Sequence, residues 1–135
     1  MDKPRRDAIF WIPRILSILF LLFLAMFSLD VFDGGYGFWG TLLALFMHNI
    51  PVFFLLTVLI IAWKHEIVGA IAYALAGLLY IGLLIYSAGR GNGEWYMLTW
   101  SIFISGPAFA IAALFLIGWH RKRKALQKTP SSSPI

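Results

Sequence analysis

The chain has 135 residues, of which 61% are hydrophobic and 13% are charged, and its formal net charge is +5. Soluble domains carry about 25% charged residues, so this composition excludes an ordinary soluble fold and indicates a protein that lipid covers. The basic residues lie toward the two ends, without a basic face interleaved with aromatics, which argues against nucleic-acid binding. The lack of cysteine excludes disulfides, cysteine-ligated zinc and thiol catalysis.

The first predicted span covers about residues 12–32 and follows a basic N-terminal segment. Trp11 suits an aromatic anchor at the membrane surface, and Pro13 suits a first helical turn. Asp30 interrupts the apolar run near its outer end. A basic start before an apolar run is also typical of a signal peptide. This run is long for one and no A-x-A-like cleavage site follows, so we expect an uncleaved helix.

The second predicted span covers residues 39–63 and carries no formal charge. It is long enough to cross a bilayer. His48, Asn49 and Pro51 lie well inside this apolar run. We therefore expect a transmembrane helix with a kinked, polar middle, around which the other spans pack.

The third predicted span covers residues 67–86 and contains no charge. Its residues Gly69, Tyr73 and Gly77 follow one another at four-residue steps and so share one face of a helix. Small residues at this spacing let helices approach closely in lipid, and this face is predicted to pack against another helix. Glu66, just before the span, suits the positive end of a helix and can pair with Lys64.

The fourth predicted span covers residues 95–119 and is expected to break at Gly106 and Pro107. A basic segment at 120–124 follows, and the polar tail of residues 125–135 is predicted to be disordered. Residues 1–124 therefore form a single transmembrane domain.

Orientation follows from the lysines and arginines. With four spans, ten of these residues fall on one side of the membrane and one, Arg90, on the other. The positive-inside rule then places both termini in the cytoplasm.

A repeated spacing relates the second and fourth spans. Trp39, Pro51 and Trp63 lie 12 residues apart, and the same pattern returns 56 residues later at 95, 107 and 119. One hypothesis is that two tandem helical hairpins share a common origin. The alternative is that tryptophans mark both membrane surfaces and that the prolines coincide by chance.

Each mid-span proline removes a backbone hydrogen bond, which frees the carbonyl groups of Met47 and Phe103. In lipid these groups need partners. The nearby donors are His48, Asn49, Ser101 and Ser105. The structural interpretation is that they satisfy the kinks and join the second span to the fourth.

The functional alternative is a polar site formed by His48, Asn49 and Asp30. His48 is the only titratable group deep in a span, roughly 13 Å from the outer surface, where histidine can serve as a proton relay or ligand contact. Asp30 could instead reach water or pair with Arg90. His65 belongs at the opposite membrane surface, too far away to share a metal site with His48. No catalytic residue, metal or cofactor is expected, because no catalytic or metal-binding spacing is found.

Four segments carry a resemblance to a known family: FSLDVF at 27–32, HNIP at 48–51, AWKHEIVG at 62–69 and ISGPAFAIAALFLI at 104–117. Together they resemble small bacterial four-span proteins grouped as a domain of unknown function. The resemblance implies an inner-membrane location and no assigned activity. Small multidrug transporters share the length but depend on a glutamate within the first span, which is absent here.

The sequence thus predicts an all-α, polytopic transmembrane four-helix bundle. The leading interpretation is a structural or accessory protein that binds partner helices, from itself or another membrane protein, through the small faces of spans three and four. The alternative is a small transporter or channel subunit, and a membrane-bound enzyme is the weakest of the three. The lipid bilayer, with anionic lipid at the basic termini, is the expected environment.

Overall fold

The computed structural model describes residues 3–91 and 96–128, and this part of the chain is helical almost throughout. Its elements are the helices α1 (Lys3–Met26), α2 (Gly37–His48), α3 (Ile50–Ala62), α4 (Glu66–Gly89) and α5 (Tyr96–Gln127), with a 3₁₀ helix η1 (Phe27–Gly34) after α1. The all-α prediction is confirmed.

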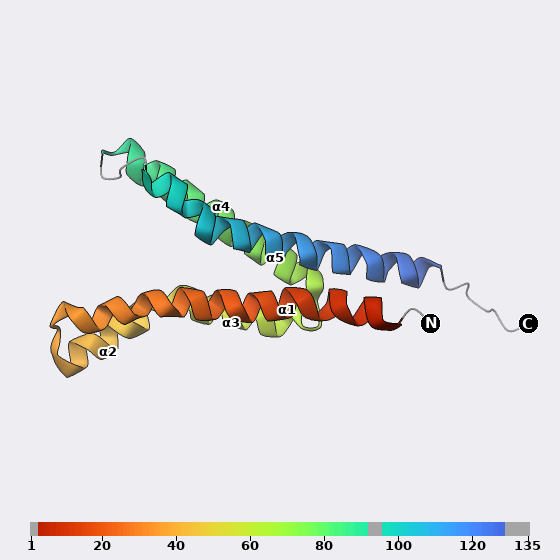
Figure 1. Ribbon diagram of the computed structural model, residues 1–135, viewed down its shortest axis with the longest axis horizontal. Helices are drawn as coiled ribbons and strands as arrows, with labels where there is room; N and C mark the ends of the chain where they lie inside the picture. The colour runs from red at the N-terminus through yellow and green to blue at the C-terminus, as the bar shows by residue number, and fades with distance from the viewer. Residues whose placement is uncertain (1–2, 92–95, 129–135) are drawn as a thin grey trace, which may run out of the picture.

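The helices lie roughly along one long axis: α1 and α4 run one way, and α2, α3 and α5 run the other (Figure 1). The start of α1 and the end of α5 lie together at what we call the terminal end. The connection from η1 to α2, the end of α4 and the start of α5 lie at the far end. Among the described residues three helices are long and apolar enough to cross a membrane, and the count rises to four if α2 and α3 form one bent span.

The predicted second span, expected as one helix with a kinked middle, is divided into two helices, α2 and α3, which meet at Asn49 with a bend of 45°. Pro51 lies in the first turn of α3, where its missing N–H costs least. The four-helix description is therefore corrected to five α-helices in the described residues.

The predicted fourth span is less interrupted than the sequence suggested, whereas the second is more interrupted. Helix α5 runs without interruption through Gly106 and Pro107, so the helix does not end there, and a kink at these two residues stays a prediction. Extensive packing along α4 holds α5 in one helix despite the missing hydrogen bond. Because the second span is broken and the fourth continuous, the two halves differ at the matching prolines. The duplication stays a hypothesis, and residue 95 of its repeat lies outside the described residues.

Two helix ends also lie elsewhere than predicted. Helix α1 begins at Lys3, which places Pro13 in its interior rather than in its first turn. Helix α5 continues to Gln127, so the basic segment at 120–124 is helical and the predicted disorder does not begin at 125. The rest of the predicted tail, 129–135, lies outside the described residues.

Helices α4 and α5 form the most closely packed pair. Gly69, Tyr73 and Gly77 are all buried on α4. A Cβ atom added at Gly69 would lie 3.0 Å from the Phe115 ring, and one added at Gly77 would lie 2.9 Å from the Phe109 ring. The Tyr73 and Phe115 rings stack with their centroids 6.1 Å apart. The small-residue face of α4 is therefore occupied from within the molecule.

The backbones of α1 and α4 each lie close to those of α3 and α5, and side chains of α1 and α4 also meet, as the Phe20 and Tyr73 rings do with centroids 6.4 Å apart. The pair α1–α3 and the pair α4–α5 are close at the terminal end and diverge toward the far end (Figure 1). In the described part of the chain α2 touches only η1 and α3, so the expected junction of the second and fourth spans is not formed.

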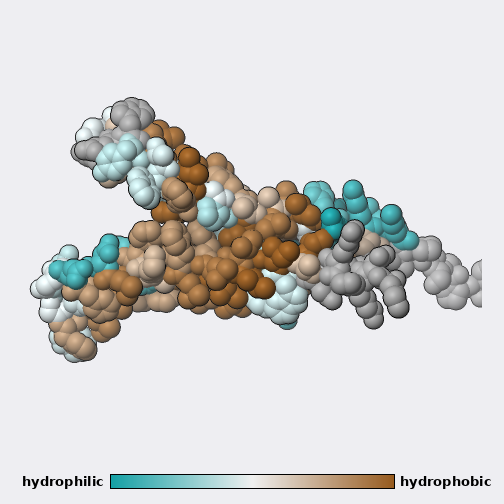
Figure 2. All heavy atoms as spheres, in the orientation of Figure 1, coloured by the Kyte–Doolittle hydropathy of each residue, from teal (hydrophilic) through white to brown (hydrophobic). Residues whose placement is uncertain are grey.

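Apolar side chains cover the outside of the molecule. Leu79 and Ile60 are each 66% exposed, and many other leucine, isoleucine and phenylalanine side chains are exposed in the same way. Figure 2 shows apolar residues across the middle of the visible face and hydrophilic residues gathered near the ends. Such a surface suits lipid rather than water.

Candidate functional site: a buried ion pair and a lateral groove

In the described part of the chain, no hydrogen bond or ion pair joins the side chains of the polar site predicted from the sequence to one another. His48, at the end of α2, and Asp30, in η1, are both exposed, and Asn49 between α2 and α3 is half-buried. In the described part of the chain no ion pair joins Asp30 to His48 or to Arg90. Arg90 lies instead over the ring of Tyr86, with 4.7 Å from its guanidinium carbon to the ring centre.

Asn49 has a local structural role. Its side-chain Nδ2 donates a hydrogen bond of 2.9 Å to the carbonyl oxygen of Leu45, and its backbone N–H lies 3.1 Å from the same oxygen. The amide thus caps the last turn of α2 at the bend. The sequence predicted a hydrogen bond to the carbonyl group of Met47, and the amide bonds to that of Leu45 instead. Ser101 and Ser105 likewise bond within α5, to the carbonyl groups of Leu98 and Ser101.

These positions yield a first prediction. Replacing Asn49 with alanine should lower the free energy of unfolding by about 1 kcal/mol, because a side-chain hydrogen bond is lost next to the bend. Replacing the neighbouring His48 with alanine should change it by less than about 0.5 kcal/mol, because this side chain is exposed. Equilibrium unfolding in mixed micelles measures both. A larger loss for His48→Ala than for Asn49→Ala would show that His48 makes contacts absent from this structure.

The best-defined polar cluster lies at the terminal end and is built around Arg14. The Arg14 side chain is fully buried. Its Nη2 atom donates to the carbonyl oxygen of Trp63 at 3.0 Å and lies 3.4 Å from Oε1 of Glu66. It also reaches the carbonyl oxygen of Ala62 at 3.5 Å, and Nη1 donates to the carbonyl oxygen of Phe10.

Aromatic rings enclose the guanidinium group. Its central carbon lies 3.4 Å from the centre of the Phe10 ring, 5.6 Å from that of Trp63 and 5.8 Å from that of Phe115. Arginine is suited to such a place because its planar group stacks on rings while its edge donates hydrogen bonds. Trp11, which contacts Trp63 edge to face, lies one turn before Arg14 and is typical of the depth at which a span meets the membrane surface.

Glu66 completes the cluster from the first turn of α4. Its side chain is 10% exposed, and its Oε2 atom is buried without a hydrogen-bond partner among the described residues. A Cβ atom added at Gly118 of α5 would lie only 3.2 Å from Oε2. The glycine therefore leaves the space that the carboxylate fills.

Through this cluster Arg14 on α1 connects to the end of α3, the start of α4 and the Phe115 ring on α5. Arginine does not lose its proton in proteins, so the pair is unsuited to relaying protons. Its evident effect is to fasten the helices together at the terminal end. We call it the Arg14 clasp: Arg14, Glu66, Phe10, Trp63 and Phe115.

Sequence reasoning missed the Arg14 clasp. It counted Arg14 among the charges flanking the first span and expected Glu66 to pair with Lys64. The ion pair instead joins residues 52 positions apart. One signal was available: with alternating spans, Arg14 and Glu66 begin the first and third spans at the same membrane surface.

One more buried polar group lies near the clasp. Tyr73 is fully buried, and no described residue accepts from or donates to its hydroxyl group within hydrogen-bonding geometry. The polar side chain beside it is Ser17, whose own hydroxyl group donates to the carbonyl oxygen of Pro13 at 2.7 Å. The predicted packing residue Tyr73 thus also places a polar atom at the junction of α1 with α4.

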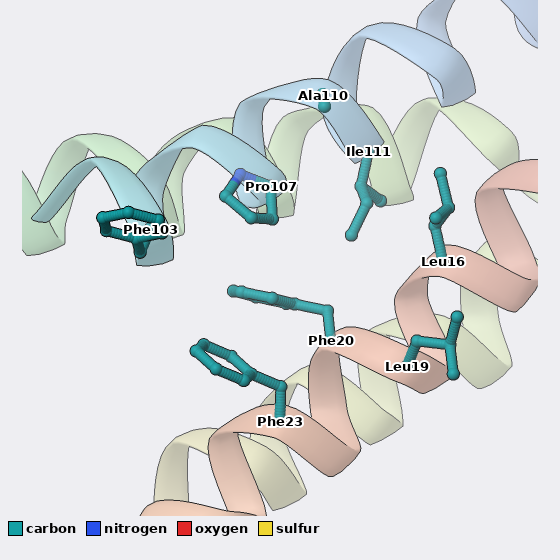
Figure 3. A pocket seen from close by; sticks show the side chains of 8 residues that line it. All are labelled: Leu16, Leu19, Phe20, Phe23, Phe103, Pro107, Ala110 and Ile111. Carbon is teal, nitrogen blue, oxygen red and sulfur yellow. The ribbon is translucent and has the colours of Figure 1, made fainter. Parts of the chain in front are cut away.

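A second feature is an apolar groove where α1 and α5 diverge, with a volume of about 360 Å³. Figure 3 shows side chains from both helices pointing into it. The residues that line this α1–α5 groove are Leu16, Leu19, Phe20, Phe23, Phe103, Pro107, Ala110 and Ile111. None of these side chains offers a polar atom, so the groove suits only an apolar occupant.

Among the described residues, no three histidine, aspartate or glutamate side chains lie close enough together to hold a metal ion.

A family model for a domain of unknown function, DUF7670, matches residues 1–127. The chain belongs to this family. No curated protein and no solved structure matches it.

The DUF7670 match covers every described helix and ends at the same residue as α5. The match therefore extends to the last helical residues of α5, three residues beyond the limit of 124 predicted from the sequence. The resemblance to a family with a domain of unknown function is confirmed, and the four-span count and bacterial origin that it implied stay predictions.

Proposed function

We propose that this DUF7670 protein is a non-catalytic accessory component of a bacterial cytoplasmic membrane that binds a transmembrane helix of a partner protein. Taken with α2 and α3 as one bent span, its five described α-helices form four spans that pack as a bundle open on one side, and both termini are cytoplasmic. The proposed docking site is the α1–α5 groove.

The topology is supported by three features. Four apolar segments reach spanning length when α2 and α3 are taken together. Both ends of the described chain lie at the terminal end (Figure 1). Ten of the eleven lysines and arginines belong to that side in a four-span arrangement, which favours a cytoplasmic terminal end.

The observation that carries the docking proposal is the α1–α5 groove together with small residues on α5. Ala110 lines the groove, and Gly106 lies one turn earlier. A Cβ atom added at Gly106 would meet only the Ile102 side chain, at 3.8 Å. Small residues four apart permit close approach of a helix backbone, and here, unlike at Gly69 and Gly77, no described helix takes that space.

A transporter or channel subunit receives less support. In the described residues the groups proposed for its polar site, Asp30, His48 and Asn49, are not joined by a side-chain hydrogen bond or ion pair, and two of them are exposed. The buried ion pair of Arg14 and Glu66 lies among aromatic rings and carbonyl groups at the terminal end, and the α1–α5 groove is apolar.

Photo-crosslinking in native membranes tests the docking proposal. A benzophenone amino acid replaces Phe103 or Leu19 in the groove, or Leu79 as a lipid-facing control on α4. Both groove positions should give an adduct with the same membrane protein, and Leu79 should not. Adding Ala110→Phe, which fills the groove, should reduce the adduct at least fivefold.

Three outcomes would contradict this function. Adducts of equal yield from Leu79 would indicate non-specific proximity. Adducts with lipid alone would indicate that the groove holds no helix. An adduct between two copies of the chain would show that the groove binds a helix of the same protein and not of a different one.

A further inference from the structure

A second cavity, of about 210 Å³, lies at the terminal end between the α3–α4 turn and the last turns of α5. Its lining residues are Lys64, His65, Glu66, Ile67, Trp119, Lys122, Arg123 and Leu126. The described structure thus gathers cationic groups from two segments that are more than 50 residues apart in the sequence. We call this cavity the basic pocket.

The uncompensated charge of the basic pocket is positive. Lys64, Lys122 and Arg123 contribute three cations. The carboxylate of Glu66 also lines the pocket, but its charge is balanced by Arg14, whose Nη2 atom lies 3.4 Å away. Helix α4 begins here without a side-chain cap, so the positive end of its dipole adds to the same field.

The walls of the basic pocket match the boundary between lipid and water. The guanidinium carbon of Arg123 lies 5.0 Å from the centre of the Trp119 ring, and tryptophan is enriched at this depth of a membrane. Ile67 and Leu126 provide apolar surface beside the cations. A ligand with an anionic head and an apolar body would meet partners for both parts.

We propose that the basic pocket binds the phosphate-bearing headgroup of an anionic membrane lipid. Lys64, Lys122 and Arg123 contact the phosphate, and Trp119 and Leu126 border the first part of the acyl chains. A free phosphate ion would use the cations but leave the apolar walls without a partner. The site is separate from the α1–α5 groove, and it does not depend on the proposed binding of a partner helix.

Native mass spectrometry of the full chain in neutral detergent tests the lipid site, with phosphatidylglycerol as the anionic probe and phosphatidylcholine as its zwitterionic counterpart. The test variant is Lys122→Gln with Arg123→Gln. The matched control is Arg121→Gln with Lys124→Gln, which removes the same charge from the same turns of α5 but from residues outside the pocket. The test variant should bind phosphatidylglycerol about 30-fold more weakly, since each basic residue contributes about fivefold near a lipid surface.

The control pair should weaken phosphatidylglycerol binding by less than about threefold, given that its charges lie outside the pocket. Equal losses in both pairs would overturn the proposal, because binding would then follow total charge. Displacement of the lipid by inorganic phosphate at millimolar concentration would also overturn it, in favour of a small-anion site.

Lys64→Gln provides an independent measurement should the α5 variants fail to fold. Lys64 is exposed in the α3–α4 turn, away from the packed helices. Its replacement should weaken phosphatidylglycerol binding about fivefold and leave phosphatidylcholine binding unchanged. No change in the affinity for phosphatidylglycerol would count against the pocket.

Discussion

Replacing Arg14 with leucine is expected to lower the free energy of unfolding by about 3–5 kcal/mol, the cost typical of breaking a buried ion pair by removing one partner. The Glu66 carboxylate would stay largely buried and lose its only ion pair in the described structure. The carbonyl groups of Ala62 and Trp63 would also lose a donor where α3 ends. Few substitutions in this chain remove so many contacts at once.

Equilibrium unfolding in mixed micelles, followed by tryptophan fluorescence, measures the effect, since the chain carries six tryptophans. Arg121→Leu is the matched control, because Arg121 is exposed on α5. Its effect should stay within about 0.5 kcal/mol. Arg14→Lys should fall between the two, because an ammonium group keeps the charge but cannot reach several carbonyl groups and stack on a ring together.

A double variant separates the ion pair from the rest of the clasp. Arg14→Leu combined with Glu66→Leu removes both charges, so it should be less destabilised than the sum of the single variants by about 1–3 kcal/mol. Additive losses would mean that the two side chains contribute independently. If Arg14→Leu unfolds like Arg121→Leu, the clasp does not hold the helices together.

Replacing Gly69 with leucine is the second large expected effect, a loss of about 3 kcal/mol. The first added carbon would already lie 2.9 Å from the Cβ atom of Ala62 on α3 and 3.0 Å from the Phe115 ring on α5. The Ala62 methyl group is fixed to the backbone and cannot rotate away. The added side chain must therefore push α4 away from both neighbours.

Gly82 supplies the matched control on the same helix, because a Cβ atom there would meet no neighbouring atom within 4 Å. Gly82→Leu should leave the unfolding free energy unchanged or raise it by up to about 0.8 kcal/mol through better helix propensity. Gly77→Leu should lie between the two, since the Phe109 ring that blocks it can turn aside. Equal stability of Gly69→Leu and Gly82→Leu would show that α4 does not pack on α5 through this face.

Local features were readable from the sequence because their causes are local. An apolar stretch of spanning length must satisfy its backbone hydrogen bonds within itself, so helices over residues 67–86 and 95–119 follow from composition and length. The four-residue steps of Gly69, Tyr73 and Gly77 likewise fix one face of a helix before any partner is known. In the structure all three residues are buried, and the two glycines of that face lie against the Phe115 and Phe109 rings of α5.

The effect of the prolines could not be read in the same way. Pro51 and Pro107 occupy equivalent places in their sequences, yet α2 and α3 meet at a 45° bend while α5 runs on. A missing hydrogen bond only permits a break. Whether the helix breaks depends on its neighbours, and α5 packs along α4 whereas, in the described part of the chain, α2 touches only η1 and α3.

The tertiary structure alone decided which distant residues meet. The sequence determined that this is an all-α chain with apolar helices of membrane-spanning length and small-residue packing faces, because helix formation in lipid depends on nearby residues. It did not determine that Arg14 turns inward to Glu66, that Gly118 makes room for that carboxylate, or that Lys64 joins Lys122 around one pocket. These juxtapositions depend on how each helix is rotated about its own axis and how far it slides along its neighbour. Both are set by the packing of all the helices together.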